Sequence, residues 1–173
     1  MLKDMKKRNF EAIILCAGNG TRLFPLTKNI NKSLLPIKKN DSALKSVIRF
    51  LYKSKIGNVL VACKSEHYNQ FSEYISNLKI EYKSLNIELI KIEKSSGTGE
   101  TLKLCKSYLD EKFLVVMGDC YIRNGFIDKK QLSIRKNHSM VLLKKVGDPQ
   151  NFGVVNFIGK RIASIVEKPS NPM

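Results

Sequence analysis

Glycine and cationic side chains follow directly on a strand-like segment near the start of this chain of 173 residues. The apolar run 12–17 has the length and bulk of a strand that is buried on both faces, as in a parallel sheet. Gly18 and Gly20 let backbone N–H groups approach an anion closely, and Arg22 adds a planar fork of donors. Lys32 supplies a second, mobile charge. These residue types in this order predict a triphosphate-binding loop at the carboxyl edge of a sheet.

Two familiar phosphate-binding motifs do not fit this loop. The chain has no Gly-Lys-Ser/Thr to close a Walker A pattern, and the pair Gly18-x-Gly20 lacks the third glycine of the dinucleotide fingerprint. A bare Gly-x-Gly is weak evidence, because a tight surface turn beside a solvated arginine contains the same residues. The loop is therefore interpreted together with the segments that follow it.

A carboxylate stands at the end of another apolar run, in the segment Val115–Cys120. Asp119 follows Gly118, and a glycine at that point opens space beside the acid. A carboxylate at the end of a buried strand can hold Mg²⁺, which prefers hard oxygen ligands and shares its shell with phosphates and water. The alternative is an aspartate that caps a turn or a helix start, and an isolated Gly-Asp pair favours that alternative.

Strand-like and helix-like segments alternate along the chain and would position these loops. Apolar runs predict strands over 12–17, 59–63, 87–92, 113–117, 140–146, 154–157 and 162–167. Helical spacing predicts helices over 43–55, 66–78, 98–109 and 128–136. This βαβ alternation indicates an α/β fold with a doubly wound sheet, in which ligands bind at the carboxyl ends of the strands.

Composition sets the outer bounds. With 43% hydrophobic residues the chain can form one domain with a real core. No apolar run approaches the length of a membrane span, and the charged start 1–8 precedes a strand rather than a signal-peptide core. We therefore expect a soluble cytoplasmic protein. Cys16, Cys63, Cys105 and Cys120 are widely spaced, which indicates reduced thiols rather than metal ligands.

The net charge of +16, from 31 basic and 15 acidic residues, makes nucleic-acid binding a hypothesis to weigh. The basic residues are spread along the chain, however, with no run longer than Lys6–Arg8, and no nucleic-acid-binding motif accompanies them. We favour a lysine-rich solvated surface that steers anionic nucleotides toward the protein.

The segments Leu15–Thr27 and Asn31–Pro36 resemble the signature of the sugar-phosphate nucleotidyltransferases. That pattern reads roughly Leu-Ala-Ala-Gly-x-Gly-Thr-Arg-Leu-x-Pro-Leu-Thr, then a spacer and Pro-Lys-x-Leu-Leu-Pro. Three further segments, Ser96–Leu102, Asp148–Val155 and Ile165–Pro172, resemble later motifs in the same order, so the resemblance spans 11–172. It implies a single domain, 1–173, with the three-layer, Rossmann-like doubly wound mixed sheet of the nucleotide-diphospho-sugar transferases.

The resemblance also implies a reaction. A sugar 1-phosphate, or a similar phosphorylated alcohol, would attack the α-phosphorus of a nucleoside triphosphate and expel pyrophosphate. By this resemblance the catalytic residues are Arg22, Lys32 and Asp119. Arg22 and the loop amides would hold the triphosphate, Lys32 would stabilise the α-phosphate region, and Asp119 would carry Mg²⁺. No acid or base is needed, because the attacking phosphate is already ionised.

Binding residues follow from the same resemblance. Those implied for the nucleotide are Leu15, Ala17, Gly18, Asn19, Gly20, Thr21, Arg22, Gly97 and Thr98. Gly97 and Thr98 also fit a turn followed by a helix N-cap, and both interpretations can hold at once. For the sugar phosphate, Gly153 and Glu167 would bind the sugar, and Lys168 would bind its phosphate. The alternative for these residues is a surface hairpin with an exposed Glu-Lys pair.

The chain departs from the family pattern at several positions. Ile92 stands where thymidylyl and uridylyl enzymes often carry the glutamine that selects the base, so the nucleobase stays open. Cys120 replaces a frequent asparagine, and 38–42 replaces a usual Lys-Pro. A second metal-binding aspartate of the relatives has no counterpart after Pro172. Two hypotheses follow. The first is a compact or truncated enzyme, whose metal site another carboxylate completes or which forms a homo-oligomer or needs a partner chain. The second is a catalytically inactive regulatory or nucleotide-binding homologue.

Overall fold

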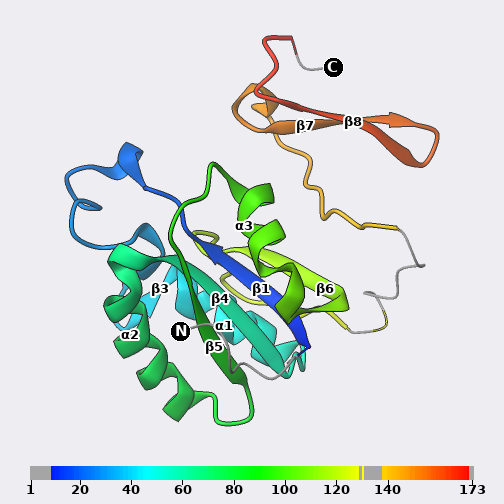
Figure 1. Cartoon of the computed structure of the whole chain (residues 1–173). Helices are drawn as coiled ribbons and strands as arrows, with labels where there is room; N and C mark the ends of the chain where they lie inside the picture. Colours follow the sequence, from blue (N-terminus) through cyan, green and yellow to red (C-terminus); the bar gives the residue numbers. More distant parts are fainter. Residues whose placement is uncertain (1–8, 129, 131–137, 172–173) are drawn as a thin grey trace. The chain divides into compact units, whose positions relative to one another are not determined.

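The computed structural model describes residues 9–128, 130 and 138–171 (Figure 1). Internal contacts divide the chain into two compact units, residues 1–133 and 134–173, and each is described by itself. The single domain over 1–173 stays a prediction.

A four-stranded parallel sheet forms the centre of the first unit, in the order β5-β4-β1-β6. Its strands are β1 (Phe10–Cys16), β4 (Asn58–Lys64), β5 (Asn86–Ile92) and β6 (Leu109–Met117). The helices of this unit are α1 (Ala43–Lys53), α2 (Tyr68–Glu81) and α3 (Thr98–Cys105). Since the strands are parallel, their carboxyl ends lie at one edge of the sheet, where the loops of interest begin.

Both faces of the sheet are covered, which explains the continuous apolar run of β1. Ala12, Ile14 and Cys16 belong to the core formed with α1 and α2. Ile13 and Leu15 alternate with them and belong to a second core that includes Cys105 of α3. Figure 1 shows α3 on one face of the sheet and α1 on the other. The predicted three-layer α/β class is confirmed. Every strand pair of this sheet among the described residues is parallel, so the antiparallel member of a mixed sheet is not among them.

Strand β6 is less buried than the sequence predicts. Leu114 and Val116 pack against the core under α1, but Phe113, Val115 and Met117 are each 40% exposed. The physical reason is the short helix α3, whose buried Cys105 joins a core built on β1, β4 and β5 rather than on β6.

The helix ends differ from the prediction by a few residues. Helix α1 begins where Ser42 Oγ accepts a hydrogen bond from the Lys45 N–H at 3.1 Å. Helix α2 starts at Tyr68 after a 3-10 turn, and α3 ends at Cys105, where another 3-10 turn follows.

A small antiparallel pair of strands, β2 (Pro36–Lys38) and β3 (Asp41–Ser42), precedes α1. None of the helices among the described residues is long and apolar enough to cross a membrane.

The second unit contains an antiparallel hairpin of β7 (Gly153–Ile158) and β8 (Arg161–Glu167), which confirms the strands predicted over 154–157 and 162–167. The prediction of a strand over 140–146 is wrong. This segment has neither helix nor strand, because no described strand pairs with it, and its apolar side chains from Met140 to Leu143 are exposed. The helix predicted over 128–136 falls almost wholly outside the described residues.

Candidate functional site

The glycine loop after β1 is held by its own backbone and by one threonine. Gly20 has φ +65° and ψ 20°, a left-handed conformation that favours glycine. Its carbonyl oxygen accepts a hydrogen bond from Thr27 Oγ1 at 2.7 Å, and Thr27 is only 4% exposed. Residues Thr21–Leu23 form a 3-10 turn between these two points. The loop therefore has a defined shape that its own contacts determine.

Asn31 attaches the Lys32 segment to the end of β1. Its Nδ2 donates a hydrogen bond to the Cys16 carbonyl oxygen at 2.9 Å, and its Oδ1 accepts one from the Ser33 N–H at 3.0 Å. Asn31 is thus the N-cap of the 3-10 turn Lys32–Leu34, and it is 2% exposed. Both ends of its amide are occupied, so the turn that carries Lys32 is fixed relative to β1.

Gly118 places the Asp119 segment beside the same strand end. The Gly118 N–H donates a hydrogen bond to the Leu15 carbonyl oxygen at 2.9 Å. A Cβ at Gly118 would overlap Cys16 Sγ and would lie 3.1 Å from the Leu15 oxygen. Only glycine fits here without movement, and this close approach brings Asp119 next to the glycine loop.

Lys32 and Asp119 meet as an ion pair, although 87 positions separate them in the sequence. Their side chains are 27% and 36% exposed, so solvent reaches both charges. The Lys32 stem lies over Gly18, where an added Cβ would be 3.4 Å from Lys32 Cε. The structure therefore brings together Gly18, Lys32 and Asp119, all of which the sequence singles out.

The other residues predicted for the nucleotide have varied settings. Arg22 is exposed, and its guanidinium has no hydrogen-bond or ion-pair partner within the described part of the chain. Leu15 is 6% exposed and faces the core with α3, whereas Ala17 is half-buried. Asn19 and Thr21 are exposed. Arg22 is thus available to an incoming anion, and the Leu15 side chain is not.

Gly97 and Thr98 lie at the start of α3, with Gly97 as the N-cap and Thr98 as the first helical residue. Ser95 Oγ donates a hydrogen bond to the Gly97 carbonyl oxygen at 2.8 Å. The Ser96 backbone N–H and hydroxyl both donate to Glu100, which holds the pKa of that carboxyl below its usual value. A Cβ at Gly97 would meet no atom within 4 Å, so the space in front of this turn is open.

Gly153, Glu167 and Lys168 lie together at one end of the hairpin in the second unit. Gly153 pairs with Glu167 across the two strands, and an added Cβ at Gly153 would be 3.4 Å from Glu167 Oε2. Lys168 has φ +46° and donates its N–H to the Phe152 carbonyl oxygen at 3.0 Å. The three residues predicted for the sugar phosphate are therefore neighbours within their own unit.

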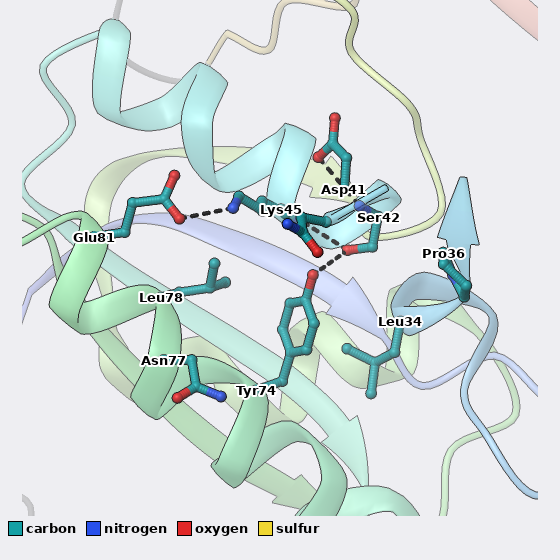
Figure 2. Close-up of a pocket in the computed structure, with 10 residues that line it drawn as sticks. Leu34, Pro36, Asp41, Ser42, Lys45, Tyr74, Asn77, Leu78 and Glu81 are labelled. Atoms are coloured by element: carbon teal, nitrogen blue, oxygen red, sulfur yellow. Dashed lines mark hydrogen bonds and ion pairs between the residues drawn. The ribbon is translucent and has the colours of Figure 1, made fainter. Parts of the chain in front are cut away.

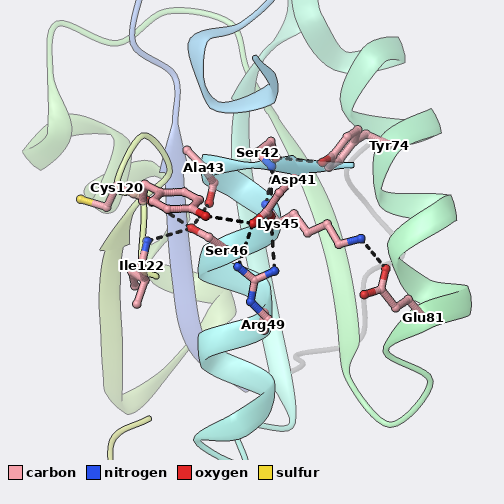
Figure 3. A network of polar contacts seen from close by, with 11 residues as sticks. Asp41, Ser42, Ala43, Lys45, Ser46, Arg49, Tyr74, Glu81, Cys120 and Ile122 are labelled. Carbon is pink, nitrogen blue, oxygen red and sulfur yellow. Dashed lines mark hydrogen bonds and ion pairs between the residues drawn. The ribbon is translucent and has the colours of Figure 1, made fainter. Parts of the chain in front are cut away.

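A polar network fixes the segment that follows Asp119 to the start of α1 (Figure 3). Ser46 Oγ donates to the Ala43 carbonyl oxygen at 2.7 Å and accepts from the Ile122 N–H at 2.9 Å. Tyr121 OH donates to Asp41 Oδ2 at 3.2 Å. Sequence reasoning does not identify the contacts of Ile122 and Tyr121, because they join residues that are 76 and 80 positions apart.

Asp41 is the acceptor at the centre of this network. Arg49 donates to it from both terminal guanidinium nitrogens, to Oδ2 at 3.0 Å and to Oδ1 at 3.3 Å. Burial alone would raise the pKa of Asp41, but the hydrogen bonds and charge of Arg49, with those from Tyr121 and the Ser42 N–H, lower it below its usual value. Asp41 is therefore a carboxylate at neutral pH.

A hollow of about 330 Å³ lies between α1, α2 and the β2–β3 pair (Figure 2). Its lining is Leu34, Pro36, Asn40, Asp41, Ser42, Lys45, Tyr74, Asn77, Leu78 and Glu81. Four of its polar side chains pair with one another, because Ser42 Oγ contacts Tyr74 OH at 2.8 Å and Lys45 pairs with Glu81 at 2.7 Å. None of the residues that the sequence predicts for substrate lines it, so it is separate from the Lys32–Asp119 pair.

All four cysteines are free thiols. Burial raises the pKa of Cys16 and of Cys63 to about 12 and that of Cys105 to about 11. Burial also raises the pKa of Cys120, and the charge of Asp119 adds to the shift. These side chains are therefore neutral near pH 7.

Comparisons with known proteins agree with the resemblance. A family model described as nucleotidyl transferase matches residues 11–173. The chain is 37% identical over 162 residues to the bifunctional protein GlmU of Methanococcus maripaludis (strain C7), covering 92% of this chain and 36% of that protein. It is 31% identical over 147 residues to D-glycero-alpha-D-manno-heptose 1-phosphate guanylyltransferase of Campylobacter jejuni, covering 84% of this chain and 62% of that protein.

Solved structures share the fold. A putative glucose-1-phosphate thymidylyltransferase from Bacillus anthracis, in complex with a sucrose, matches with a TM-score of 0.79 and 27% identity, over 94% of this chain and 65% of that one. A UDP-glucose pyrophosphorylase from Acinetobacter baumanii matches with a TM-score of 0.72 at 18% identity, over 94% of this chain and 68% of that one, which supports the fold alone. The chain spans about 36% of the length of the GlmU relatives.

Proposed function

The chain belongs to the nucleotidyl transferase family, and we propose that it transfers a nucleotidyl group from a nucleoside triphosphate to a sugar 1-phosphate with release of pyrophosphate. The observation that carries this proposal is the meeting of Lys32 and Asp119 over the glycine loop at the carboxyl edge of the parallel sheet. One cation and one carboxylate there suit a reaction between two anions that repel each other.

The proposed step is one displacement at phosphorus. An oxygen of the sugar 1-phosphate forms a bond to the α-phosphorus, the bond from that phosphorus to the β-phosphate oxygen breaks, and pyrophosphate leaves with the bonding electrons. The loop amides around Gly18 and Gly20, with Arg22, bind the triphosphate. Lys32 neutralises charge at the α-phosphate. By the sequence resemblance, Gly97 and Thr98 lie against the nucleobase, and Gly153, Glu167 and Lys168 bind the acceptor.

Asp119 is the residue that we propose to hold Mg²⁺. No group of three His, Cys, Asp or Glu side chains that could enclose a metal occurs in the described ranges. A single solvent-exposed carboxylate nevertheless suits Mg²⁺, which is bound through one or two carboxylates together with substrate phosphates and water. When bound, the ion would neutralise charge on the phosphates during transfer.

The test is pyrophosphate release by the full chain in the presence of Mg²⁺, with ATP, CTP, GTP, UTP and dTTP crossed against a panel of sugar 1-phosphates. Because relatives are named for a heptose 1-phosphate with guanylyl transfer and for glucose 1-phosphate with thymidylyl transfer, these pairs come first. We expect release that requires one triphosphate and one acceptor. Arg22→Ala should raise the KM for the triphosphate, and Asp119→Ala should abolish turnover that depends on Mg²⁺.

The outcomes separate two functions. Full activity of Asp119→Ala would refute the metal assignment. Nucleotide binding without pyrophosphate release across the whole panel would instead indicate a regulatory homologue that only binds nucleotide.

We propose that the protein acts in the cytoplasm, since free thiols persist in that reducing compartment. A homo-oligomer or a partner chain stays a prediction, which the mass of the assembly in solution tests.

A further inference from the structure

Building on the proposed function, we propose that Lys64 is a further nucleotide-binding residue, which holds the terminal phosphates of the nucleoside triphosphate. Lys64 is the last residue of β4, the strand next to β1 in the sheet. The register pairs Cys16 with Cys63, so Lys64 stands one position beyond the end of β1. The strand order therefore puts this lysine at the sheet edge where the glycine loop begins.

The Lys64 ammonium contacts the glycine loop directly. Its Nζ donates a hydrogen bond to Oδ1 of Asn19, the residue between Gly18 and Gly20, across 45 positions of sequence. Lys32 covers the preceding residue, Gly18. Two consecutive loop residues are thus each covered by an ammonium from a different element, one on the β6 side of β1 and one on the β4 side.

The charge of Lys64 is only weakly compensated. Asn19 offers a neutral amide oxygen, and the contact between Lys64 Nζ and Glu66 Oε1 is long, at 3.9 Å, to a side chain that is 63% exposed. An exposed pair of this kind contributes little. Lys64 is 27% exposed, as Lys32 is. Its ammonium can therefore turn to a phosphate that lies along the loop amides.

The position of Lys32 and Asp119 determines which phosphates Lys64 would meet. The reacting α-phosphate belongs beside Lys32 and Asp119 in the proposed reaction. The remainder of the triphosphate then extends along the loop from Gly18 toward Asn19, where the Lys64 ammonium lies. Lys64 should therefore bind the β- and γ-phosphates and contribute little to a nucleoside monophosphate.

The experiment compares nucleotides of different phosphate number. Dissociation constants are measured by calorimetry with Mg²⁺ for UMP, UDP and UTP, and for the guanosine and thymidine series, on the 173-residue chain and on its variants Lys64→Met and Lys79→Met. Lys79 is an exposed lysine of α2, so its variant has the same net charge without a change at the loop. We expect Lys64→Met to weaken triphosphate binding about tenfold, the loss of one charge-assisted contact, and monophosphate binding less than twofold. Lys79→Met should match the wild type.

A variant of the contact residue separates phosphate binding from loop support. If Lys64 acted only by holding Asn19, Asn19→Ala would reproduce the selective loss of triphosphate affinity. Because Asn19 is itself predicted to contact the nucleotide, we expect Asn19→Ala to weaken monophosphate and triphosphate binding by similar factors and so to retain most of the difference between them. Lys64→Arg should restore the affinity for triphosphate that Lys64→Met loses. Steady-state kinetics should show a higher KM for the triphosphate in Lys64→Met, with kcat within twofold of the wild type.

Three results would each overturn the assignment of Lys64. In the first, Lys64→Met loses affinity equally for monophosphate and triphosphate, and in the second it loses no affinity at all. In the third, Asn19→Ala reproduces the selective loss of triphosphate affinity. With the assignment overturned in this way, pyrophosphate release by the wild type would still support the proposed function. A selective loss in Lys64→Met together with no pyrophosphate release would instead refute the proposed enzyme and leave Lys64 as a triphosphate-binding residue. A wild type that binds no nucleoside triphosphate would overturn both.

Discussion

Lys32 and Asp119 compensate each other's charge in the nucleotide-free protein. Their ion pair lies where solvent reaches both groups, so its strength is modest. Each group is also the natural partner of a substrate component, because the ammonium suits a phosphate and the carboxylate suits a divalent cation. A cation that binds Asp119 before the nucleotide does must therefore compete with the Lys32 ammonium.

This competition leads to a prediction about metal affinity. Lys32→Met should tighten Mn²⁺ binding to the nucleotide-free protein by about threefold to tenfold, since removal of a nearby positive charge near a protein surface is worth on the order of 1 kcal/mol. Electron paramagnetic resonance of free Mn²⁺ measures the affinity. Asp119→Asn should eliminate Mn²⁺ binding at this position both in the wild type and in Lys32→Met. Equal affinities of wild type and Lys32→Met would show that the lysine does not oppose the metal.

Asn31 is the buried residue on which the position of Lys32 depends. Asn31→Ala removes the N-cap acceptor and the donor to the Cys16 carbonyl, so we expect a loss of about 1–2 kcal/mol in the free energy of unfolding. Asn31→Asp keeps the acceptor for the Ser33 N–H but turns a carboxylate oxygen toward that carbonyl. Denaturant titration measures stability, and steady-state kinetics measures kcat.

The kinetic result distinguishes positioning from general stabilisation. Both Asn31 variants should lower kcat more than they raise the KM for the triphosphate, because Lys32 is displaced while the glycine loop keeps its Thr27 contact. We expect the larger decrease in Asn31→Asp. Stability losses with an unchanged kcat at a permissive temperature would contradict this role.

At the scale of elements, the start of α1 connects two loops. Ser42 caps the helix, Ser46 binds the segment after Asp119, and Arg49 holds Asp41, which in turn accepts from Tyr121 (Figure 3). One helix thereby stabilises the segment that carries the candidate metal ligand. Its polar side chains form a network rather than a set of isolated surface pairs.

The lowered pKa of Asp41 makes this network sensitive to acid. A carboxyl whose pKa is lower in the folded than in the unfolded chain stabilises the fold at pH values above its ordinary pKa of 3.8. This contribution disappears as the pH falls through the pKa of the folded state. Asp41→Asn should therefore lose about 1–2 kcal/mol of stability at pH 7 and should depend less steeply on pH below about 4 than the wild type. Urea titrations at pH 7, 4 and 3 measure both effects. Parallel pH profiles for the two proteins would show that another group controls the acid response.

Local patterns predict some elements well and others poorly. The run 12–17 is apolar on both faces because two helical layers cover β1, so its sequence alone indicates a central strand. The run 140–146 has similar composition but no pairing partner among the described strands. Strand formation depends on a neighbour, and composition does not specify that neighbour.

At the scale of the whole molecule, the net charge of +16 should attract nucleotides. Raising NaCl from about 50 to about 300 mM shortens the Debye length roughly 2.4-fold, so the KM for the triphosphate should rise several-fold while kcat changes less than twofold. Steady-state kinetics measures both constants, and a neutral osmolyte of equal osmolarity should leave them unchanged. A decrease in kcat at constant KM would show that salt acts on the chemical step instead.

The candidate site divides into a part that the sequence predicts and a part that requires the fold. Gly18, Lys32 and Asp119 belong to motifs at fixed spacing, so their common location follows from the strand order. The contacts that place them end on backbone carbonyl oxygens, which give no sequence signal. Lys64 is one of many lysines, and only the adjacency of β4 and β1 distinguishes it.

Two consecutive peptide groups of β1 anchor the two segments that bear the reacting charges. The Leu15 carbonyl accepts from Gly118 and the Cys16 carbonyl accepts from Asn31, each at 2.9 Å. A displacement of β1 therefore moves both segments together and leaves their separation nearly unchanged. Changes in the distance between Lys32 and Asp119 should then occur on the picosecond-to-nanosecond timescale of side-chain rotamers, uncoupled from the slower collective motions of the sheet.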